Sequence, residues 1–313
     1  MTTIARRDRI AGGLLGLLVG DALGVPYEFH PPQEIPPPEQ IEFVPPPGFR
    51  RAHVGVSPGT WSDDGAQALA LLASLLDRGR FDADDFGQRL VAWYERGVLA
   101  VDGKVFDVGI QTAQAIRAIT AGTPAASAGS ADEYANGNGA LMRVLPLALW
   151  HRGTDAELVA DAHAQSRVTH GHLRSQICCA LYCLWARQIL AEHPEPWQAV
   201  VATLRELYRI DTAAQAELEF SIRPDDPPEG RGSGYVVDCL RSARLVLETG
   251  AYEQVVKAAV ALGNDTDTTA CVAGGIAGLR DGLYAIPERW RSQLRGSELL
   301  APLRDRLLEW CDG

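Results

Sequence analysis

The amino-acid sequence predicts an all-α fold, and its composition supports this prediction in two ways. Hydrophobic residues make up 46% of the 313 residues, with many alanines and leucines, and runs of β-branched or aromatic residues are few. Alanine and straight-chain residues favour helices, whereas strands favour β-branched and aromatic residues. The chain exceeds the usual single-domain length, but no linker divides it near its centre. We therefore expect residues 1–313 to form one large domain.

The expected elements follow in chain order. The first is a helix over residues 8–23. The segment from Pro31 to Pro47 is too rich in proline for a regular helix, so we expect an ordered loop or a lid there. Residues 221–234, rich in Pro, Asp, Arg and Gly, form a second expected loop. Apolar spacing predicts the remaining helices at 64–78, 83–96, 109–121, 139–151, 155–165, 173–192, 196–208, 235–248, 252–262 and 267–280.

The N-terminal segment resembles a secretory signal, because Arg6-Arg7-Asp8-Arg9 gives it a basic start and an apolar stretch runs from Ile10 to Gly20. That stretch is too short to span a bilayer, and Asp21 ends it. Cleavage near this point would detach Glu28, a candidate functional carboxylate, or leave it at a frayed end. We therefore expect a buried first helix and a cytoplasmic protein.

Small residues recur at helical spacing in two of the expected helices. One set is Gly12, Gly16 and Gly20, and the other is Ala270, Gly274 and Gly278. Each set forms a stripe that permits a neighbouring helix to approach closely. The same spacing occurs in membrane helices, but neither segment reaches spanning length, so close packing inside a soluble protein is expected.

Charge and cysteine content exclude several classes of protein. The formal net charge of −11 argues against a chain that coats nucleic acid or an anionic membrane, although a single small anionic ligand is compatible with it. The six cysteines form neither a C-x-x-C motif nor a regular disulfide framework. We expect buried free thiols in a reducing compartment, and a monomer.

Two short acidic clusters lie far apart in the sequence, and each leads into an expected helix. The first is Ser62-Asp63-Asp64 and the second is Asp265-Thr266-Asp267-Thr268. Carboxylate and hydroxyl oxygens suit Mg²⁺ or Mn²⁺ rather than zinc. Four aspartates balance two divalent cations, and such a pair, typically ~3.5–4 Å apart, can hold vicinal hydroxyls and a water. Together the clusters predict one metal site.

Two other interpretations fit part of this pattern. Acidic and hydroxyl residues at a helix start can simply cap it, and Asp63, Asp64 and Thr268 could each do so. Class I terpenoid synthases are also all-α and magnesium-dependent, with motifs similar to D-D-x-x-D and N-D-x-x-[ST]-x-x-x-E. Here Gln67 and Val272 occupy the positions where those motifs require an acid, so both patterns fail at their last ligand.

Five motifs occur in order along the chain. They are Gly20-Asp21-Ala22-Leu23-Gly24 with Glu28, Ser62-Asp63-Asp64, Gly137-Asn138-Gly139-Ala140-Leu141-Met142-Arg143, Gly232-Ser233-Gly234-Tyr235-Val236, and Asn264-Asp265-Thr266-Asp267-Thr268-Thr269. In this order they resemble the ADP-ribosylglycohydrolase family, especially the bacterial branch related to dinitrogenase-reductase-activating hydrolases. The resemblance runs from about Asp8 to about Trp290. The resemblance implies a compact orthogonal helical bundle with two Mg²⁺ or Mn²⁺ ions at the base of a cleft. It also implies an enzyme that removes ADP-ribose from a modified group.

The resemblance also implies roles for individual residues. One ion would be bound by Ser62, Asp63, Asp64 and Asp267, and the other by Asp265, Asp267 and Thr268, with Asp267 bridging. Glu28, Asp63 and Asp265 would be the catalytic carboxylates. The positions expected to face the ADP-ribose are Gly137, Asn138 and Gly139 at the distal ribose and phosphates, Gly109 at a phosphate, His170 near the ligand and Tyr235 beside the adenine.

Two positions depart from the commonest family pattern. Asn264 replaces a glycine, and asparagine is the next-best residue for a left-handed conformation. Ser62 replaces a threonine and keeps its hydroxyl oxygen, so neither change removes a ligand. Three further polar residues are expected to be structural: Arg143, His163 and His172.

Glu28 is the candidate general acid/base, because the four aspartates are committed to the cations. In the alternative interpretation, Glu28 ends the first helix and hydrogen-bonds to the proline-rich loop. An anionic ligand needs no basic patch if helix N-termini and glycine loops supply N–H donors. This reconciles an ADP-ribosyl ligand with an acidic protein.

The sequence does not decide which ADP-ribosyl linkage is hydrolysed. In each candidate linkage, departure of the leaving group gives the distal ribose oxocarbenium character. We expect the N-glycosidic bond of ADP-ribosyl-arginine on a protein, because the bacterial resemblance is closest there. The alternatives are an O-linked substrate (serine, O-acetyl-ADP-ribose or polymer) and a catalytically silent, crystallin-like relative that only binds. The complete ligand set argues against the silent relative.

Overall fold

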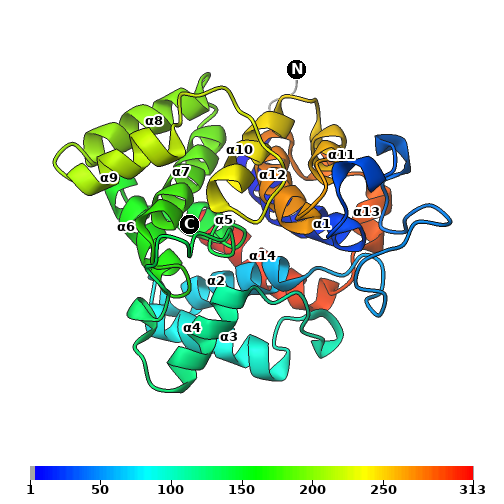
Figure 1. The fold of residues 1–313 in the computed structure, drawn as a ribbon, viewed down its shortest axis with the longest axis horizontal. Helices are drawn as coiled ribbons and strands as arrows, with labels where there is room; N and C mark the ends of the chain where they lie inside the picture. The colour runs from blue at the N-terminus through cyan, green and yellow to red at the C-terminus, as the bar shows by residue number, and fades with distance from the viewer. Residues whose placement is uncertain (1–3, 313) are drawn as a thin grey trace.

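The computed structural model describes residues 4–312, which form helices joined by turns and loops, with no β-strand among them. The predicted all-α orthogonal bundle is confirmed, because the helices run in several directions around a shared apolar core (Figure 1). The α-helices are α1 (Arg6–Gly24), α2 (Asp63–Arg78), α3 (Ala83–Arg96), α4 (Ile110–Thr120), α5 (Leu145–Trp150), α6 (Asp155–Arg167), α7 (Leu173–Leu190), α8 (Pro196–Leu207), α9 (Thr212–Ala216), α10 (Val236–Leu247), α11 (Tyr252–Ala261), α12 (Thr266–Asp281), α13 (Glu288–Gln293) and α14 (Ser297–Asp312). The shorter turns are η1 (Val25–Tyr27), η2 (Pro32–Glu34), η3 (Pro38–Gln40), η4 (Val101–Gly103), η5 (Ala125–Ser127), the π-helical η6 (Glu217–Ile222) and η7 (Leu283–Ala285).

One predicted helix is wrong over half of its length. The sequence predicts a helix over 139–151, but α5 begins only at Leu145. Before it, the N–H groups of Leu141 and Met142 both donate to the carbonyl of Asn138 in a series of turns. Pro146 explains the late start, because proline lacks an N–H and fits the first turn of a helix.

Some elements were not expected from the sequence. These are α9 with its continuation η6, which shortens the loop expected at 221–234, and the C-terminal helices α13 and α14. In α14, Leu300, Leu303 and Leu307 are buried at i, i+3 and i+7, a spacing that could have identified this helix. The segment from Pro31 to Pro47 contains only the short turns η2 and η3, in agreement with the expected loop.

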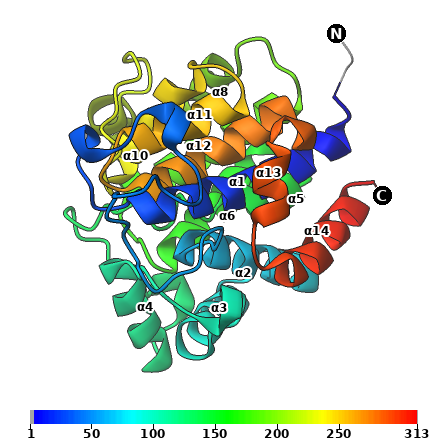
Figure 2. The same ribbon diagram turned by 90° about the vertical axis from the view of Figure 1, so that its right-hand side faces the viewer.

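The two small-residue stripes face each other where α1 and α12 pack antiparallel (Figure 2). A Cβ atom added to Gly20 would lie 2.1 Å from the carbonyl oxygen of Ala270, and one added to Gly16 would lie 2.5 Å from that of Gly274. Distances this short leave no room for a side chain. The predicted close approach is therefore confirmed, and each stripe is the neighbour of the other.

We expect Gly20→Ala to destabilise the protein, although alanine normally favours a helix interior by roughly 1 kcal/mol over glycine. The backbone of α12 blocks the new methyl group, so the free energy of unfolding should fall by about 1–3 kcal/mol. Urea denaturation measures the change. Ala202→Gly on the exposed face of α8 calibrates the propensity term alone. A Gly20→Ala protein more stable than the wild type would contradict the close packing.

The first helix, α1, is a core helix, as expected. However, the prediction that its apolar stretch is too short to span a membrane is wrong. Residues Arg6–Tyr27 are long and apolar enough to cross a membrane by length and composition, with a mean hydropathy of 1.5. The expectation of a segment too short to span fails because the apolar residues continue beyond Asp21. However, 94% of the most apolar window is buried inside the protein. The surface that a membrane would cover is already covered by other helices.

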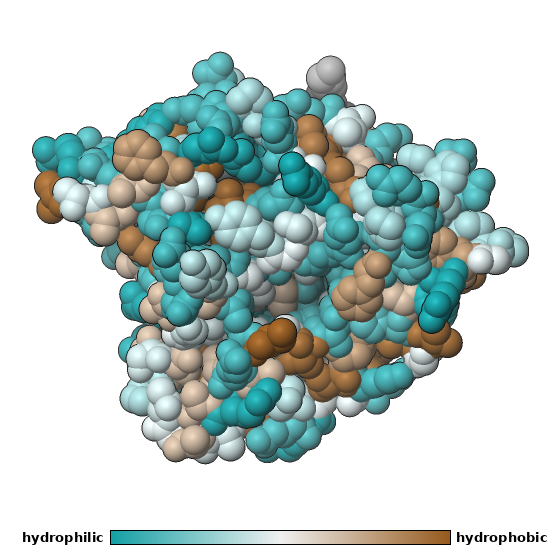
Figure 3. All heavy atoms as spheres, viewed as in Figure 1, coloured by the Kyte–Doolittle hydropathy of each residue, from teal (hydrophilic) through white to brown (hydrophobic). Residues whose placement is uncertain are grey.

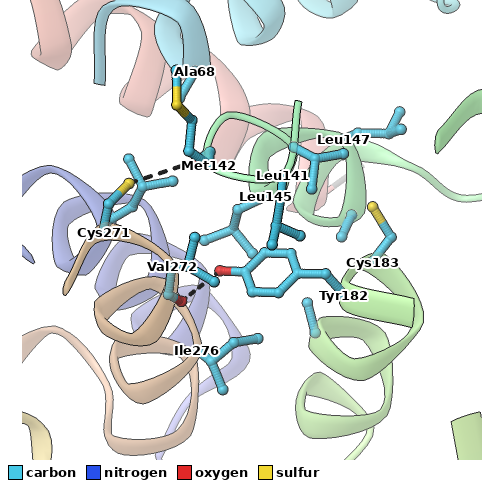
Figure 4. Close-up of a cluster of buried hydrophobic side chains, with 14 of the residues drawn as sticks. Ala68, Leu141, Met142, Leu145, Leu147, Tyr182, Cys183, Cys271, Val272 and Ile276 are labelled. Carbon is cyan, nitrogen blue, oxygen red and sulfur yellow. Dashed lines mark hydrogen bonds between the residues drawn. The ribbon is translucent and has the colours of Figure 1, made fainter. Parts of the chain in front are cut away.

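A buried apolar cluster joins α7, α12 and the turns before α5 (Figure 4). The Tyr182 hydroxyl donates to the carbonyl oxygen of Val272 at 2.8 Å, and Cys271 Sγ lies 3.6 Å from the carbonyl oxygen of Met142. These bonds hold the 137–144 segment against α12. The cysteines are free, as predicted, and they are buried except for the half-buried Cys311.

Arg143 is structural, as expected. It is fully buried and donates to Gln67 Oε1 at 2.8 Å and to Thr169 Oγ1 at 2.7 Å. The other two residues expected to be structural also serve the fold. His163 Nε2 lies 2.7 Å from the Tyr208 hydroxyl, and the His172 side chain accepts the N–H of Arg174 to cap α7.

Candidate active site

The two acidic clusters meet where α2 and α12 begin. Thr268 Oγ1 lies 3.4 Å from Asp64 Oδ1, although the two residues are 204 positions apart. Carboxylate oxygens of Glu28, Asp265 and Asp267 also lie within 4.8 Å of one another. The sequence prediction of a single acidic site is therefore confirmed in its geometry.

The antiparallel packing of α1 on α12 produces this convergence. Gly24, at the end of α1, approaches so closely that an added Cβ would lie 2.3 Å from the Cα of Asp267. Thr266 Oγ1 donates to the carbonyl of Gly24 at 2.8 Å and fixes the two helix ends together. Because Glu28 follows α1 by only a short turn, it is delivered to the start of α12.

The cap of α2 is made by residues other than its acidic pair. Ser62 Oγ accepts the N–H of Asp64 at 3.2 Å. The buried carboxylate of Asp21 accepts the N–H groups of Ser62 and Gly65 at 2.9 and 2.8 Å. Asp63 and Asp64 make no cap bond of their own, but Ser62 of the same cluster caps the helix and both aspartates lie in its first turn, so the capping interpretation holds for part of the first cluster. In α12, neither Asp265 nor Thr268 makes a side-chain cap bond.

Two oxygens of the cluster are buried without a hydrogen-bonding partner among the described residues: Oδ2 of Asp64 and Oδ2 of Asp267. Burial raises the pKa of Asp63, Asp64 and Asp267 well above the usual range, and neighbouring carboxylates raise it further. A cation would supply the missing charge and the missing partners. This set of oxygen donors fits a hard metal ion.

Glu28 is buried and forms a hydrogen bond with His53, with 2.6 Å between Oε2 and Nε2. Asp107 Oδ1 lies 4.0 Å from the same nitrogen. Burial, followed by the charge of Asp107, raises the pKa of Glu28 to about 10. A carboxyl group that retains its proton can act as a general acid. The alternative interpretation placed this hydrogen bond with the proline-rich segment from Pro31 to Pro47. The partner is instead His53, which follows that segment in the sequence.

Four non-glycine residues around this site adopt left-handed backbone conformations. They are Phe29, His53, Asp107 and Asn264, with φ between 49° and 64°. The conformation expected for Asn264 is therefore confirmed. Phe29 donates its N–H to the carbonyl of Asn264 at 2.7 Å, and Asn264 donates its own to His30 at 2.6 Å. Such strained positions cluster at functional sites, where the surrounding structure enforces them.

The acidic cluster lies in a cleft of about 910 Å³. Figure 3 shows the surface hollowed near the centre of the view, with hydrophilic residues around most of the opening. Every substrate-binding residue predicted from the resemblance lines this cleft: Gly109, Gly137, Asn138, Gly139, His170 and Tyr235. The tertiary structure therefore places them together with Glu28, Asp63, Asp64, Asp265 and Thr268, which also line the cleft.

The segment Gly137-Asn138-Gly139, called the glycine loop below, is held mainly by hydrogen bonds within the protein. Gly137 donates its N–H to Gln111 Oε1 at 2.9 Å, and Asn138 donates its own to the carbonyl of Gly234 at 3.0 Å. The Asn138 side-chain amide donates to Asp265 Oδ2 at 2.8 Å. The resemblance implied that these residues offer N–H and amide groups to the ADP-ribose, but those of Gly137 and Asn138 already have partners in the protein. Asn138 orients a predicted metal ligand instead.

The other cleft residues come from separate elements. Gly109 precedes α4, and Tyr235 precedes α10 and forms an isolated β-bridge with Gly137. His170 is buried, and Thr169 Oγ1 lies 2.7 Å from its Nδ1. Burial lowers the pKa of His170 to about 3, so this imidazole is neutral at physiological pH.

Comparisons with known proteins show the family to which this chain belongs. The family model described as ADP-ribosylglycohydrolase matches residues 2–313. The chain belongs to the ADP-ribosylglycohydrolase family. It is 30% identical to the ADP-ribosylarginine hydrolase Tri1 of Pseudomonas putida (strain GB-1), over 96% of this chain and 78% of that protein. It is 31% identical to the ADP-ribosyl-[dinitrogen reductase] glycohydrolase of Rhodospirillum rubrum, over 94% and 92% of the two chains. A solved structure titled "ADP-ribosylglycohydrolase-related protein complex" matches with a TM-score of 0.77 and 32% identity, over 97% of this chain and 98% of that one.

Sequence reasoning missed three residues of this ADP-ribosylglycohydrolase site. Asp21 belongs to a quoted motif, but its contact with the start of α2 depends on helix packing. Asp107 lies two residues before Gly109, and the resemblance assigned a role only to Gly109. His53 lies in a segment without helical or motif signal. No local pattern connects it to Glu28, 25 residues earlier.

Proposed function

We propose that this ADP-ribosylglycohydrolase is a hydrolase that removes ADP-ribose from arginine side chains of a modified protein, with two divalent cations, Mg²⁺ or Mn²⁺, as cofactors. The observation that carries the proposal is the convergence of both acidic clusters, with their unpartnered oxygens, in one large cleft. The cations would be held by Ser62, Asp63, Asp64, Asp265, Asp267 and Thr268. When bound, they would orient the ribose hydroxyls and lower the pKa of a water.

The chain's own residues account for the rest of the reaction. Hydrolysis breaks the bond between the distal ribose anomeric carbon and the guanidinium nitrogen, and the oxygen of water takes the place of that nitrogen. Glu28 moves a proton between the water and the leaving nitrogen, since its carboxyl group lies among the metal-binding carboxylates. Neutral His170 and Tyr235 form parts of the cleft wall against which the nucleotide packs.

Asp107 supports arginine as the leaving group. Its half-buried carboxyl group lines the cleft beside Glu28, on the loop before α4. A guanidinium ion is planar and positively charged, and a carboxylate recognises it through paired N–H donors. A serine or acetyl leaving group carries no such charge. The names of the Pseudomonas putida and Rhodospirillum rubrum relatives point to the same linkage or to a modified protein.

A product assay tests this proposal. ADP-ribosyl-arginine, ADP-ribosyl-serine, O-acetyl-ADP-ribose and ADP-ribose polymer are each incubated with the protein, with and without Mg²⁺ or Mn²⁺. We expect release of ADP-ribose from ADP-ribosyl-arginine, and only with metal. Turnover of an O-linked member instead would identify the alternative linkage. Binding of ADP-ribose without turnover of any member would identify the silent, crystallin-like alternative.

We also propose that the protein acts in the cytoplasm as a monomer. The burial of α1 within the core supports the first part, because cleavage within α1 would remove core side chains. An intact mass that corresponds to cleavage near Ala22 would contradict it.

A further inference from the structure

The Glu28 carboxyl group lies among other acidic side chains. Carboxyl oxygens of Asp265, Asp267 and Asp107 each lie within 4.8 Å of one of its oxygens. An ionised carboxylate has no proton to donate, so these neighbours are poor partners for holding Glu28 in one orientation. His53 differs from them, because its imidazole Nε2 lies 2.6 Å from Glu28 Oε2 and can donate or accept a hydrogen bond.

The backbone that carries His53 is clamped at several points. Ala52 donates its N–H to the carbonyl of Pro26, in the turn just before Glu28. The Arg51 side chain donates to the carbonyl of Val56 at 2.6 Å, and the Lys104 amine donates to the carbonyl of Gly55 at 2.6 Å. His53 itself has a φ of 49°, a conformation that few side chains adopt. These hydrogen bonds fix the backbone of the loop and therefore the direction in which the His53 side chain leaves it.

Two aromatic rings pack near the imidazole of His53. The ring centroid of Phe106 lies 5.1 Å from that of His53, and the ring centroid of Phe29 lies 5.6 Å from it. Phe29 is 70% exposed and also has a positive φ, so burial of its own ring does not account for its position. Together the rings limit rotation of the imidazole.

We propose that His53 is the positioning residue for Glu28, and that its hydrogen bond holds the Glu28 carboxyl in the orientation from which it transfers a proton. This inference rests on the proposed role of Glu28. His53 acts through Glu28 and need not touch the substrate. A misplacement of about 1 Å at a reacting group can reduce turnover about 10²-fold, which sets the scale of the expected effect.

Two substitutions at position 53 separate the hydrogen bond from the shape of the loop. His53→Asn suits a positive φ better than alanine, but its side chain is too short to reach Glu28. His53→Gln places an amide near the position of Nε2, where it can donate or accept. We expect His53→Asn to lower kcat about 10–100-fold, with KM for ADP-ribosyl-arginine nearly unchanged. His53→Gln should recover most of the loss.

A double-mutant cycle with Glu28→Gln shows whether the effect passes through Glu28. Glu28→Gln with His53→Asn should be no slower than Glu28→Gln alone, because the positioned group is already inactive. Val54→Ala, at an exposed neighbour in the same loop, is the matched control and should behave as the wild type. Fully additive losses, or a raised KM with unchanged kcat, would overturn the inference.

A readout independent of turnover keeps the inference testable if the proposed function fails. Crystal structures of the wild type and His53→Asn, grown under the same conditions, should show the Glu28 carboxyl ordered in the first and displaced in the second. An unmoved Glu28 carboxyl in His53→Asn would overturn the inference. Inactivity of the wild type towards all four substrates would instead overturn the proposed function, and the structures would still decide the role of His53.

Discussion

Asp267→Asn is expected to abolish metal-dependent release of ADP-ribose. Asp267 is fully buried, and its Oδ2 has no partner among the described residues. If it bridges both cations, an amide at this position removes the charge on which both depend. The remaining ligands would then face two divalent ions with one carboxylate fewer, so we expect turnover at the background level of the assay.

Thermal stability provides a second measurement for Asp267. A cation that binds only the native state stabilises it by mass action, so Mn²⁺ should raise the Tm of the wild type and should raise that of Asp267→Asn far less. Asp281→Asn, at the other end of α12, is the control and should keep both the activity and the Mn²⁺ effect. Undiminished turnover in Asp267→Asn would eliminate the dinuclear site.

The pH dependence of this stabilisation has a defined sign. The native pKa values of Asp63, Asp64 and Asp267 lie above the unfolded value of about 3.9, so without metal their ionisation costs stability as pH rises above that value. A bound cation opposes this cost and displaces protons. The rise in Tm caused by Mn²⁺ should therefore be larger near pH 8 than near pH 6.

Glu28→Gln is expected to reduce turnover by roughly 10²–10⁴-fold, the range for loss of a general acid/base. Glutamine has nearly the same shape and can keep a hydrogen bond to His53, but it cannot transfer a proton in the same way. Binding of ADP-ribose and metal should stay almost normal, as measured by calorimetry. The effect should thus appear in kcat rather than in KM.

Glu34→Gln is a suitable control, because Glu34 is an exposed glutamate in the neighbouring proline-rich segment. It should match the wild type in turnover and in binding. Lost affinity with unchanged kcat in Glu28→Gln would make Glu28 a binding residue. No change in either quantity would restore its structural interpretation.

The tertiary structure changes the meaning of several motif residues. The glycine loop resembles a ligand-binding loop in sequence, yet the N–H groups of Gly137 and Asn138 are already bonded within the protein. Its contribution is to bring Asn138 to Asp265 and to let Gly139 pack against His170, where an added Cβ would lie 2.8 Å from Cε1. The loop therefore contributes to the site mainly through the positions of Asn138 and Gly139, and not through the N–H groups of Gly137 and Asn138.

The sequence by itself determined the helical fold, the first core helix, the small-residue stripes and the acidic groups that begin α2 and α12. These features are local, because helix periodicity, capping and short motifs depend on residues a few positions apart. Even here the start of α5 was missed, since one proline outweighed a longer apolar pattern.

Only the tertiary structure decided which groups complete the site. Asp21 reaches the start of α2 because α1 packs beside it, and His53 reaches Glu28 because clamped, left-handed backbone turns the loop toward the cleft. Asp107 joins them from a third segment. Such contacts join residues that are distant in sequence, and they depend on the close packing of α1 against α12 along their small residues, which a local pattern cannot encode.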